Sequence, residues 1–207
     1  MRASLTAILV LCLSPAAVAD VVIFDLGSQA NGSAVDGVAS GMLTRQGITA
    51  TFSANDGVLN ATGSWFGINA SGSGDVTDQI DAGSGVSESV HITFDLPVEF
   101  LQLSLASFSG SERALLTVGG SPPQLLAATA PAIDVYDFTA ASFPQGNVLA
   151  AGQPLVIGYT FGSAEDNGFS LSGFQVRAVP EPSSWAVMVP LATAWLRRRR
   201  RAAPRTK

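Results

Sequence analysis

Three regularly spaced aspartates are the part of this sequence that most resembles a chemical site. Asp75, Asp78 and Asp81 lie three residues apart in a stretch rich in glycine and serine, and Glu88 follows them. Calcium takes six to eight oxygen ligands, which carboxylates and carbonyls on a loop supply. The spacing differs from that of the EF-hand loop. A calcium site is one interpretation, and aspartates that solvate a loop and cap its turns are the other.

His91 is the only histidine of the sequence. Its alternation with Ile92 and Phe94 predicts that it lies on the solvent face of a strand. A catalytic histidine needs a nucleophile or an acid within reach, and the sequence contains no Gly-x-Ser-x-Gly elbow. One histidine also cannot build a histidine-rich zinc site. We therefore expect a solvent-facing strand residue and no catalytic role.

Paired carboxylates, as glycosidases use them, are not a specific signal in this sequence. Fifteen acidic residues lie between Asp20 and Ala178, so that some pair falls at any chosen distance. The sequence predicts no catalytic residues and no enzyme activity.

Three aromatic residues are candidates for a platform on which a sugar ring stacks: Trp65, Phe66 and Tyr159. Neighbouring residues of a strand point to opposite faces, so at most one of Trp65 and Phe66 faces outward. Core packing is the alternative for all three. An outward Trp65 or Tyr159 would favour a domain that binds polysaccharide, whereas a face of serine, threonine and glycine would favour a structural role.

Short stretches with a period of two residues recur along the chain, and helix signals are scarce. The pattern predicts nine or more strands, of which nine are placed at residues 21–26, 48–53, 64–69, 90–95, 100–105, 114–118, 135–139, 154–161 and 169–177. In the fifth of these, Gln102 and Ser104 lie on the face opposite to the leucines. Asn167-Gly168 is the strongest hairpin signal. We predict an antiparallel all-β sandwich, of the jelly-roll type, with one face of each sheet buried.

Charge is distributed unevenly along the chain. Residues 20–178 contain 15 acidic residues and only three basic ones, a formal net charge of −12, whereas the whole chain carries −5. These residues, about 160 in number, are enough for one domain with a core. Such an acidic domain does not bind nucleic acid, whose phosphates need cationic partners.

The first 19 residues have the features of a secretory signal peptide. Arg2 is followed by an apolar stretch from Leu5 to Leu13, and Ala17-Val18-Ala19 forms an A-x-A cleavage site. We expect export through the Sec translocon, with cleavage by signal peptidase between Ala19 and Asp20. The only cysteine, Cys12, lies in the apolar stretch, so the mature domain has no disulfide.

Residues 179–207 combine a polar motif, an apolar segment and a basic end. Val179 to Ser184 is followed by an apolar helix predicted at 185–196, and the basic tail at 197–207 begins with Arg197, Arg198, Arg199, Arg200 and Arg201. An apolar helix can enter a bilayer, and arginines hold its end in the cytoplasm. The segment has twelve residues, fewer than the roughly 20 that span a bilayer core, but snorkelling arginines and local thinning shorten the requirement. The alternative is a buried C-terminal core helix with a solvated basic end.

This tail resembles the PEP-CTERM sorting signal of Gram-negative bacteria. The resemblance rests on Val-Pro-Glu-Pro-Ser-Ser-Trp, the apolar helix and the arginine cluster. It implies that an exosortase, an integral-membrane cysteine transpeptidase, recognises Pro180, Glu181 and Pro182. It also implies an association with exopolysaccharide and biofilm.

The domain itself resembles one group of PEP-CTERM proteins. The shared features are Phe66-Gly67-Ile68-Asn69, then Asp75 to Asp81, which ends in Asp-x-Ile-Asp, then Glu88 to Phe94. This resemblance implies a jelly-roll sandwich similar to carbohydrate-binding modules.

We therefore expect a signal peptide at 1–19, a β-sandwich at 20–178 and a sorting signal at 179–207. The protein would be held transiently at the inner membrane and would reach the cell surface or the extracellular matrix without enzymatic activity. The alternative is a module that binds exopolysaccharide, either with calcium as a cofactor or without it.

Overall fold

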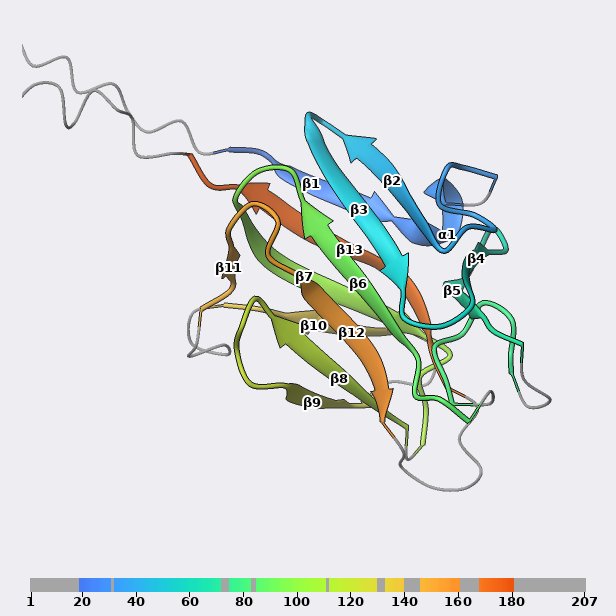
Figure 1. Ribbon diagram of the computed structural model, residues 1–207. Coiled ribbons are helices and arrows are strands. Elements are labelled where there is room, and N and C mark those ends of the chain that lie inside the picture. The colour runs from blue at the N-terminus through green and yellow to red at the C-terminus, as the bar shows by residue number, and fades with distance from the viewer. Residues whose placement is uncertain are drawn as a thin grey trace, which may run out of the picture.

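The computed structural model describes residues 19–30, 32–71, 75–82, 85–110, 112–129, 133–139, 146–160 and 168–180. In this part of the chain, two antiparallel sheets pack against each other as a β-sandwich, which confirms the predicted all-β sandwich (Figure 1). The predicted signal peptide, apart from Ala19, and the predicted helix at 185–196 lie outside the described residues. Among the described residues, no helix has the length and apolar character needed to cross a membrane.

The first sheet, sheet A, contains the first and the last strand of the described chain. Its main path is β10-β7-β13-β5-β4, with β1 paired to β13 and β11 paired to β7. The strands are β1 Val21–Asp25, β4 Val58–Ala61, β5 Phe66–Asn69, β7 Val98–Ala106, β10 Ile133–Asp137, β11 Val148–Leu149 and β13 Ser170–Ala178.

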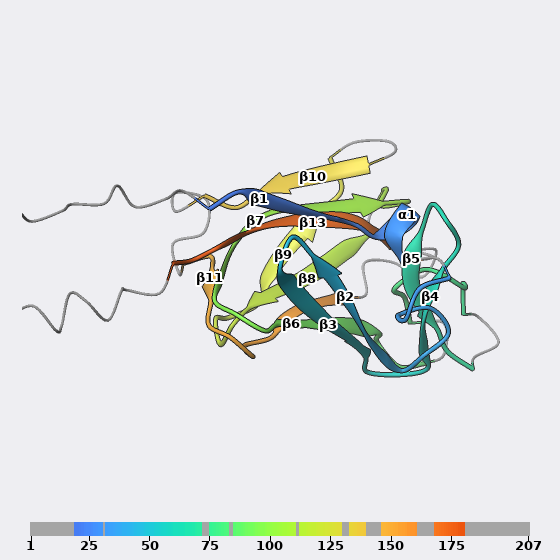
Figure 2. The same ribbon diagram turned by 90° about the horizontal axis from the view of Figure 1, so that it is seen from above.

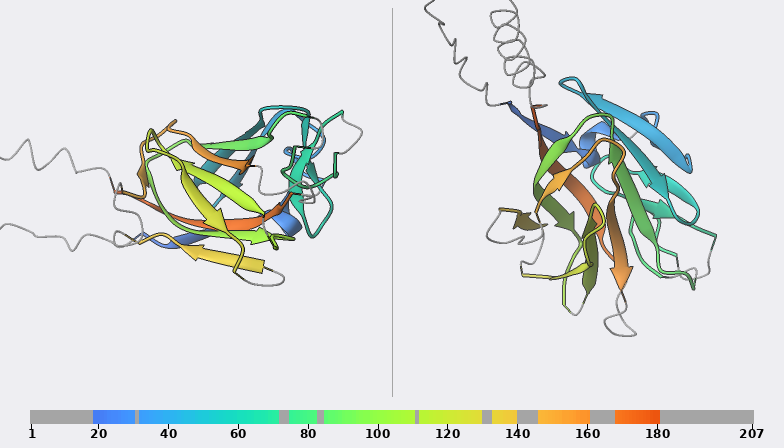
Figure 3. Two further views of the ribbon diagram at one scale, coloured as in Figure 1. Left: turned by 90° about the horizontal axis from the view of Figure 1, so that it is seen from below. Right: turned by 60° about the vertical axis from the view of Figure 1, so that its left-hand side comes forward.

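The second sheet, sheet B, has the order β2-β3-β6-β12-β8-β9. Its strands are β2 Ser40–Arg45, β3 Ile48–Ala54, β6 Ser89–Phe94, β8 Arg113–Val118, β9 Gln124–Ala127 and β12 Leu155–Thr160. Figures 2 and 3 show the two sheets as separate layers with their inner faces toward each other.

Each of the nine predicted strands overlaps an observed one, and four observed strands were not predicted. Strands β4, β9 and β11 have at most four residues each, too few for a clear pattern. Strand β2 lies at an edge of sheet B, and Leu43 is its only buried residue. An edge strand with one buried side chain does not need alternating apolar and polar residues, so its sequence does not predict a strand.

The prediction of a hairpin at Asn167-Gly168 is wrong. Strand β12 belongs to sheet B and β13 to sheet A, so the connection between them crosses from one layer to the other. Gly168 has a φ of +87°. A Cβ atom there would lie 2.4 Å from the Cβ of Asp81. The glycine is needed for a close contact with a neighbouring loop.

A cluster of phenylalanines fills the centre of the sandwich. Phe174 stacks on Phe24 with ring centroids 4.8 Å apart, and the rings of Phe52, Phe94 and Phe100 lie within 6.5 Å of the Phe174 ring. These rings come from both sheets, because inward-facing positions alternate along each strand. Burial of each ring contributes about 1.5–3 kcal/mol to stability.

The described chain begins and ends at the same pole of the sandwich. Strand β1 pairs with β13 in antiparallel register, with Val21 opposite Arg177 and Asp25 opposite Gly173 (Figure 1). After β1 the chain forms the short helix α1, Leu26–Gln29, whose N-terminus is capped by the Asp25 carboxylate. The segment with the three regularly spaced aspartates lies at the opposite pole, next to the beginning of β13.

Candidate functional site

Three carboxylates gather at this far pole. Oxygen atoms of Asp75, Asp81 and Glu88 all lie within 4.8 Å of one another. Asp81 is 2 % exposed, Glu88 is fully buried and Asp75 is half-buried. We call these three residues the carboxylate cluster.

Asp78, the middle aspartate of the regular spacing, lies outside the cluster. It lies within a tight turn that is closed by the Gln79 N–H, which donates to the Val76 carbonyl at 3.0 Å. Asp78 has a φ of +72°, a left-handed conformation that aspartate tolerates better than most residues. Its carboxylate accepts the Thr62 hydroxyl at 2.6 Å. The structure therefore brings together two of the three predicted aspartates and adds Glu88.

The segment that carries the cluster connects the two sheets. Ile80 forms an antiparallel bridge with Phe169, beside β13 of sheet A. Glu88 directly precedes β6 of sheet B, and its carbonyl accepts the N–H of Tyr159 in β12 at 2.9 Å. The carboxylate cluster therefore lies where the chain crosses from one layer to the other.

Two glycines allow this segment to pack closely. A Cβ on Gly67 in β5 would lie 2.4 Å from the carbonyl carbon of Asp78, and a Cβ on Gly168 would meet Asp81 at the same distance. Real Cβ atoms do not approach other atoms so closely, so any larger residue would displace the segment.

A main-chain N–H donates to each carboxylate of the cluster and orients it. Ala70 donates to Asp75 at 3.2 Å, Val76 donates to Asp81 at 3.0 Å, and Asp81 donates to Glu88 Oε2 at 2.9 Å. The other Glu88 oxygen, Oε1, is buried and has no hydrogen-bond partner among the described residues. A buried acceptor without a donor is costly, so this atom requires a proton or a cation.

Burial is the main reason why the pKa of Glu88 rises from its ordinary value of 4.5 to about 8. The hydrogen bond from the Asp81 N–H acts in the opposite direction. The charges of Asp81 and Asp75 raise the pKa further, as does a hydrogen bond that the protonated Glu88 carboxyl can form with Asp75. At neutral pH the cluster therefore favours either a proton on Glu88 or a bound positive ion.

The cluster is suited to holding a hard cation and not to attacking a substrate. Carboxylate oxygens are the ligands that calcium and magnesium prefer. Asp81 and Glu88 are buried, so a polysaccharide chain cannot reach them. The calcium prediction from the sequence stays a prediction, with the candidate ligands now specified.

His91 and the aromatic candidates lie elsewhere. His91 is half-buried, and its Nε2 lies 3.2 Å from the Ser89 hydroxyl. Trp65 is half-buried just before β5, and Phe66 is fully buried. The suggestion of Tyr159 as an outward platform is corrected, because Tyr159 is 4 % exposed. It follows Leu155 and Ile157 at the same alternating positions of β12 and faces the core with them.

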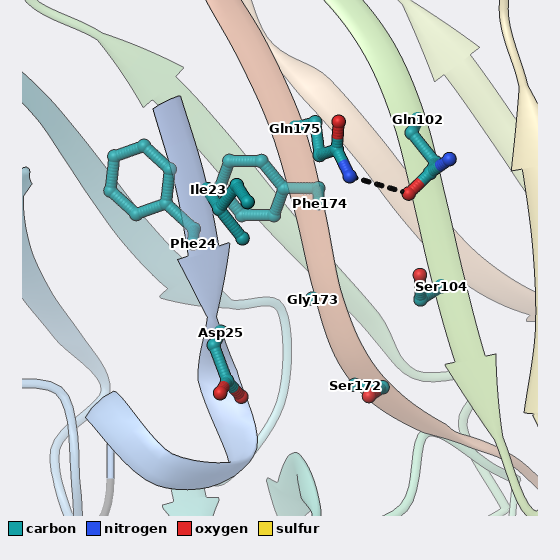
Figure 4. Close-up of a pocket in the computed structure, with 9 residues that line it drawn as sticks. All are labelled: Ile23, Phe24, Asp25, Gln102, Ser104, Ser172, Gly173, Phe174 and Gln175. Carbon is teal, nitrogen blue, oxygen red and sulfur yellow. Dashed lines mark hydrogen bonds between the residues drawn. The ribbon is translucent and has the colours of Figure 1, made fainter. Parts of the chain in front are cut away.

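A second candidate site is a hollow of about 250 Å³ on the outer face of sheet A (Figure 4). It is lined by Ile23, Phe24, Asp25, Gln102, Ser104, Ser172, Gly173, Phe174 and Gln175. The Gln175 amide donates to the Gln102 side-chain oxygen at 2.7 Å. Gln102 in turn donates to Asp137 at 2.8 Å.

This hollow offers amides, hydroxyls and a carboxylate but no stacking ring. Phe24 and Phe174 are buried with their rings in the core. Such a surface can form hydrogen bonds with sugar hydroxyls. The sequence placed Gln102 and Ser104 on this outward face, whereas Gln175 was not singled out, although it alternates with buried Phe174 and Val176.

The predicted processing residues lie only partly within the described chain. Ala19 is half-buried, and Asp20 and Pro180 are exposed. Glu181, Pro182 and Arg197 to Arg201 lie outside the described residues. No family model and no curated protein matches the sequence.

Proposed function

We propose that this chain is an exported, non-enzymatic β-sandwich protein that is sorted through Pro180-Glu181-Pro182. The signal peptide would direct it through the Sec translocon, and the apolar segment at 185–196 would stop it in the inner membrane. An exosortase-type transpeptidase would then process it near the motif. The product would reach the cell surface or the extracellular matrix, in association with exopolysaccharide.

The observation that carries this proposal is the pairing of Val21 with Arg177. It brings the predicted mature N-terminus and the start of the sorting motif to one pole of the domain. Both membrane-directed segments then leave from the same side, and the rest of the sandwich extends away from the bilayer. Ends at opposite poles would need a long linker to reach one membrane.

The motif begins two residues after β13, the last strand of the described chain. The Val179 N–H donates to the Pro97 carbonyl at 2.9 Å, and Pro180 is exposed directly after it. Pro180 and Pro182 lack main-chain donors and favour an extended chain around Glu181. An extended segment with one negative charge is what a protease-like cleft accepts.

The finer fold assignment is a jelly roll, and the strand order supports it. Eight strands form two four-stranded sets, β5-β13-β7-β10 and β6-β12-β8-β9. In the first set β13 lies between β5 and β7, and in the second set β12 lies between β6 and β8. A late strand inserted between two earlier ones is the arrangement that two Greek keys produce in a jelly roll. Strands β2 and β3 extend sheet B, and β1 adds to sheet A.

The experiment follows the size and destination of the protein in its native host. Mass spectrometry of the mature protein should find an N-terminus at Asp20 and a C-terminus before Trp185. Replacing Glu181 with glutamine, or deleting Arg197 to Arg201, should leave unprocessed protein in the membrane or misdirect it. Asp95→Asn is the control, an exposed acidic residue outside the motif that should be processed normally. Unchanged size and destination in both test variants would refute the proposal.

The second candidate function is binding of exopolysaccharide, which the polar hollow favours. If it holds, Gln175→Ala should weaken binding in affinity electrophoresis. Thr117→Ala, on the outer face of sheet B, should not. Equal migration of both variants and the wild-type protein, with and without polysaccharide, would exclude binding at the hollow.

A further inference from the structure

We propose that Asp75, Asp81 and Glu88 bind one calcium ion, which joins the two sheets at the pole opposite to the chain ends. This inference concerns the folded domain and does not depend on how the protein is sorted.

The few basic residues of the domain donate hydrogen bonds to groups outside the cluster. Between Asp20 and Ala178 the only basic residues besides His91 are three arginines. Arg45 donates to Gln29, Arg113 to the carbonyl of Glu112, and Arg177 to Glu99. Three gathered carboxylates, two of them buried, repel one another unless one is protonated or a positive ion lies between them.

The unpartnered oxygen of Glu88 points to the same conclusion. Glu88 is fully buried, and its Oε1 has no donor among the described residues. Its carboxylate belongs to the group of oxygens within 4.8 Å of one another. The other oxygen already accepts the Asp81 N–H, which fixes the orientation of the carboxylate, as second-shell contacts do at metal sites.

The separation of the oxygens suits calcium. Ligand oxygens at about 2.4 Å from one ion lie up to about 4.8 Å apart. The carboxylate oxygens of the cluster lie within 4.8 Å of one another, close enough for one calcium ion to contact all three. Magnesium demands near-octahedral geometry and usually keeps several waters. Two of the three carboxylates are buried, which favours calcium, an ion that dehydrates more readily.

A bound ion would tie together parts of the chain from both layers. Asp81 follows the bridge to Phe169 in sheet A, and Glu88 leads into β6 of sheet B. A ligand that binds only the folded state raises its stability by mass action. Calcium would therefore stabilise the whole sandwich.

The test is the thermal unfolding of the full chain in EDTA, in calcium chloride and in magnesium chloride at matched ionic strength. At a hundredfold excess over its dissociation constant, calcium should raise the melting temperature by about 5 °C or more. Titration calorimetry should give about one ion per chain. A response to magnesium as large as that to calcium would overturn the assignment to calcium.

The matched variants are Glu88→Gln and Asp78→Asn. Glutamine keeps an acceptor for the Asp81 N–H and removes the charge, so Glu88→Gln should fold and lose the calcium response. Asp78→Asn changes the regularly spaced aspartate outside the cluster and should keep the response. No calcium-dependent shift in the wild-type protein, or equal shifts in both variants, would show that a proton alone occupies the cluster and would overturn the proposal.

Discussion

Asp81 and Glu88 are joined by two hydrogen bonds. The Asp81 N–H donates to the Glu88 carboxylate at 2.9 Å, and the Glu88 N–H donates to the Asp81 carbonyl at 2.9 Å. This pairing draws the Glu88 side chain into the protein and away from water. The ionisation state of one carboxylate is thereby coupled to the connection between the two sheets.

The first prediction concerns the stability of the metal-free protein as pH changes. The pKa of Glu88 is raised to about 8 in the folded protein, against 4.5 ordinarily. The fold therefore favours the protonated acid, and this contribution is complete below about pH 4.5 and lost as pH rises toward about 8. In EDTA, the melting temperature should fall by several degrees between about pH 5.5 and about pH 8.5.

The control for this prediction is Glu88→Gln, which cannot ionise. Its melting temperature should change less than that of the wild-type protein over the same pH range. Parallel curves for the two proteins would mean that Glu88 does not titrate as the structure indicates.

The second prediction concerns Gly168, whose contact with Asp81 leaves no room for a side chain. Gly168 and Gly146 have the same φ of +87°. A Cβ on Gly168 would lie 2.4 Å from Asp81, whereas a Cβ on Gly146 would meet no atom within 4 Å. Gly146→Ala should cost about 1–2 kcal/mol in unfolding free energy. Gly168→Ala should cost about 3 kcal/mol or more, measured by urea unfolding. Equal losses of unfolding free energy in the two variants would show that the loop with Asp81 moves to accommodate the added methyl group.

The third prediction concerns Phe174, at the centre of the phenylalanine cluster. Phe174→Ala should lower the free energy of unfolding by about 3–5 kcal/mol, because it leaves a cavity between the sheets. Leu125→Ala removes an apolar side chain that is 57 % exposed and should change it by less than about 0.5 kcal/mol. Chemical denaturation of both variants measures the difference, and a loss at Phe174 below about 1 kcal/mol would contradict the observed packing.

The fourth prediction concerns Asn147, a buried amide beside β11. Its Nδ2 donates to the carbonyls of Phe100 at 2.8 Å and Phe138 at 2.9 Å. Asn147→Ala leaves these acceptors without their donor and should lower the free energy of unfolding by about 1–3 kcal/mol. Asn69→Ala, at an exposed position of β5, should have little effect. Similar unfolding curves for the two variants would argue against this role.

The sequence by itself determined many of the strand residues that face the core. The alternation fails at Phe100, which is buried, and at Leu101, which is half-buried, because the pairing of β7 with β13 shifts its register there. Leu103, Leu105, Ile92 and Phe94 are buried as their alternation predicts, because the side-chain period of a strand is a local property. The sequence also showed that the domain has almost no basic residues to balance its acidic ones. The proposal of a sorting signal likewise rests on neighbouring residues read in order.

Only the tertiary structure decided which carboxylates meet. Asp78 turns away because its backbone is left-handed, a conformation that regular spacing does not reveal. Glu88 joins the cluster through hydrogen bonds between residues seven positions apart. Similarly, Gly168 serves a contact between layers and not a hairpin. Contacts between distant segments depend on how the sheets pack, and local sequence patterns contain no record of that packing.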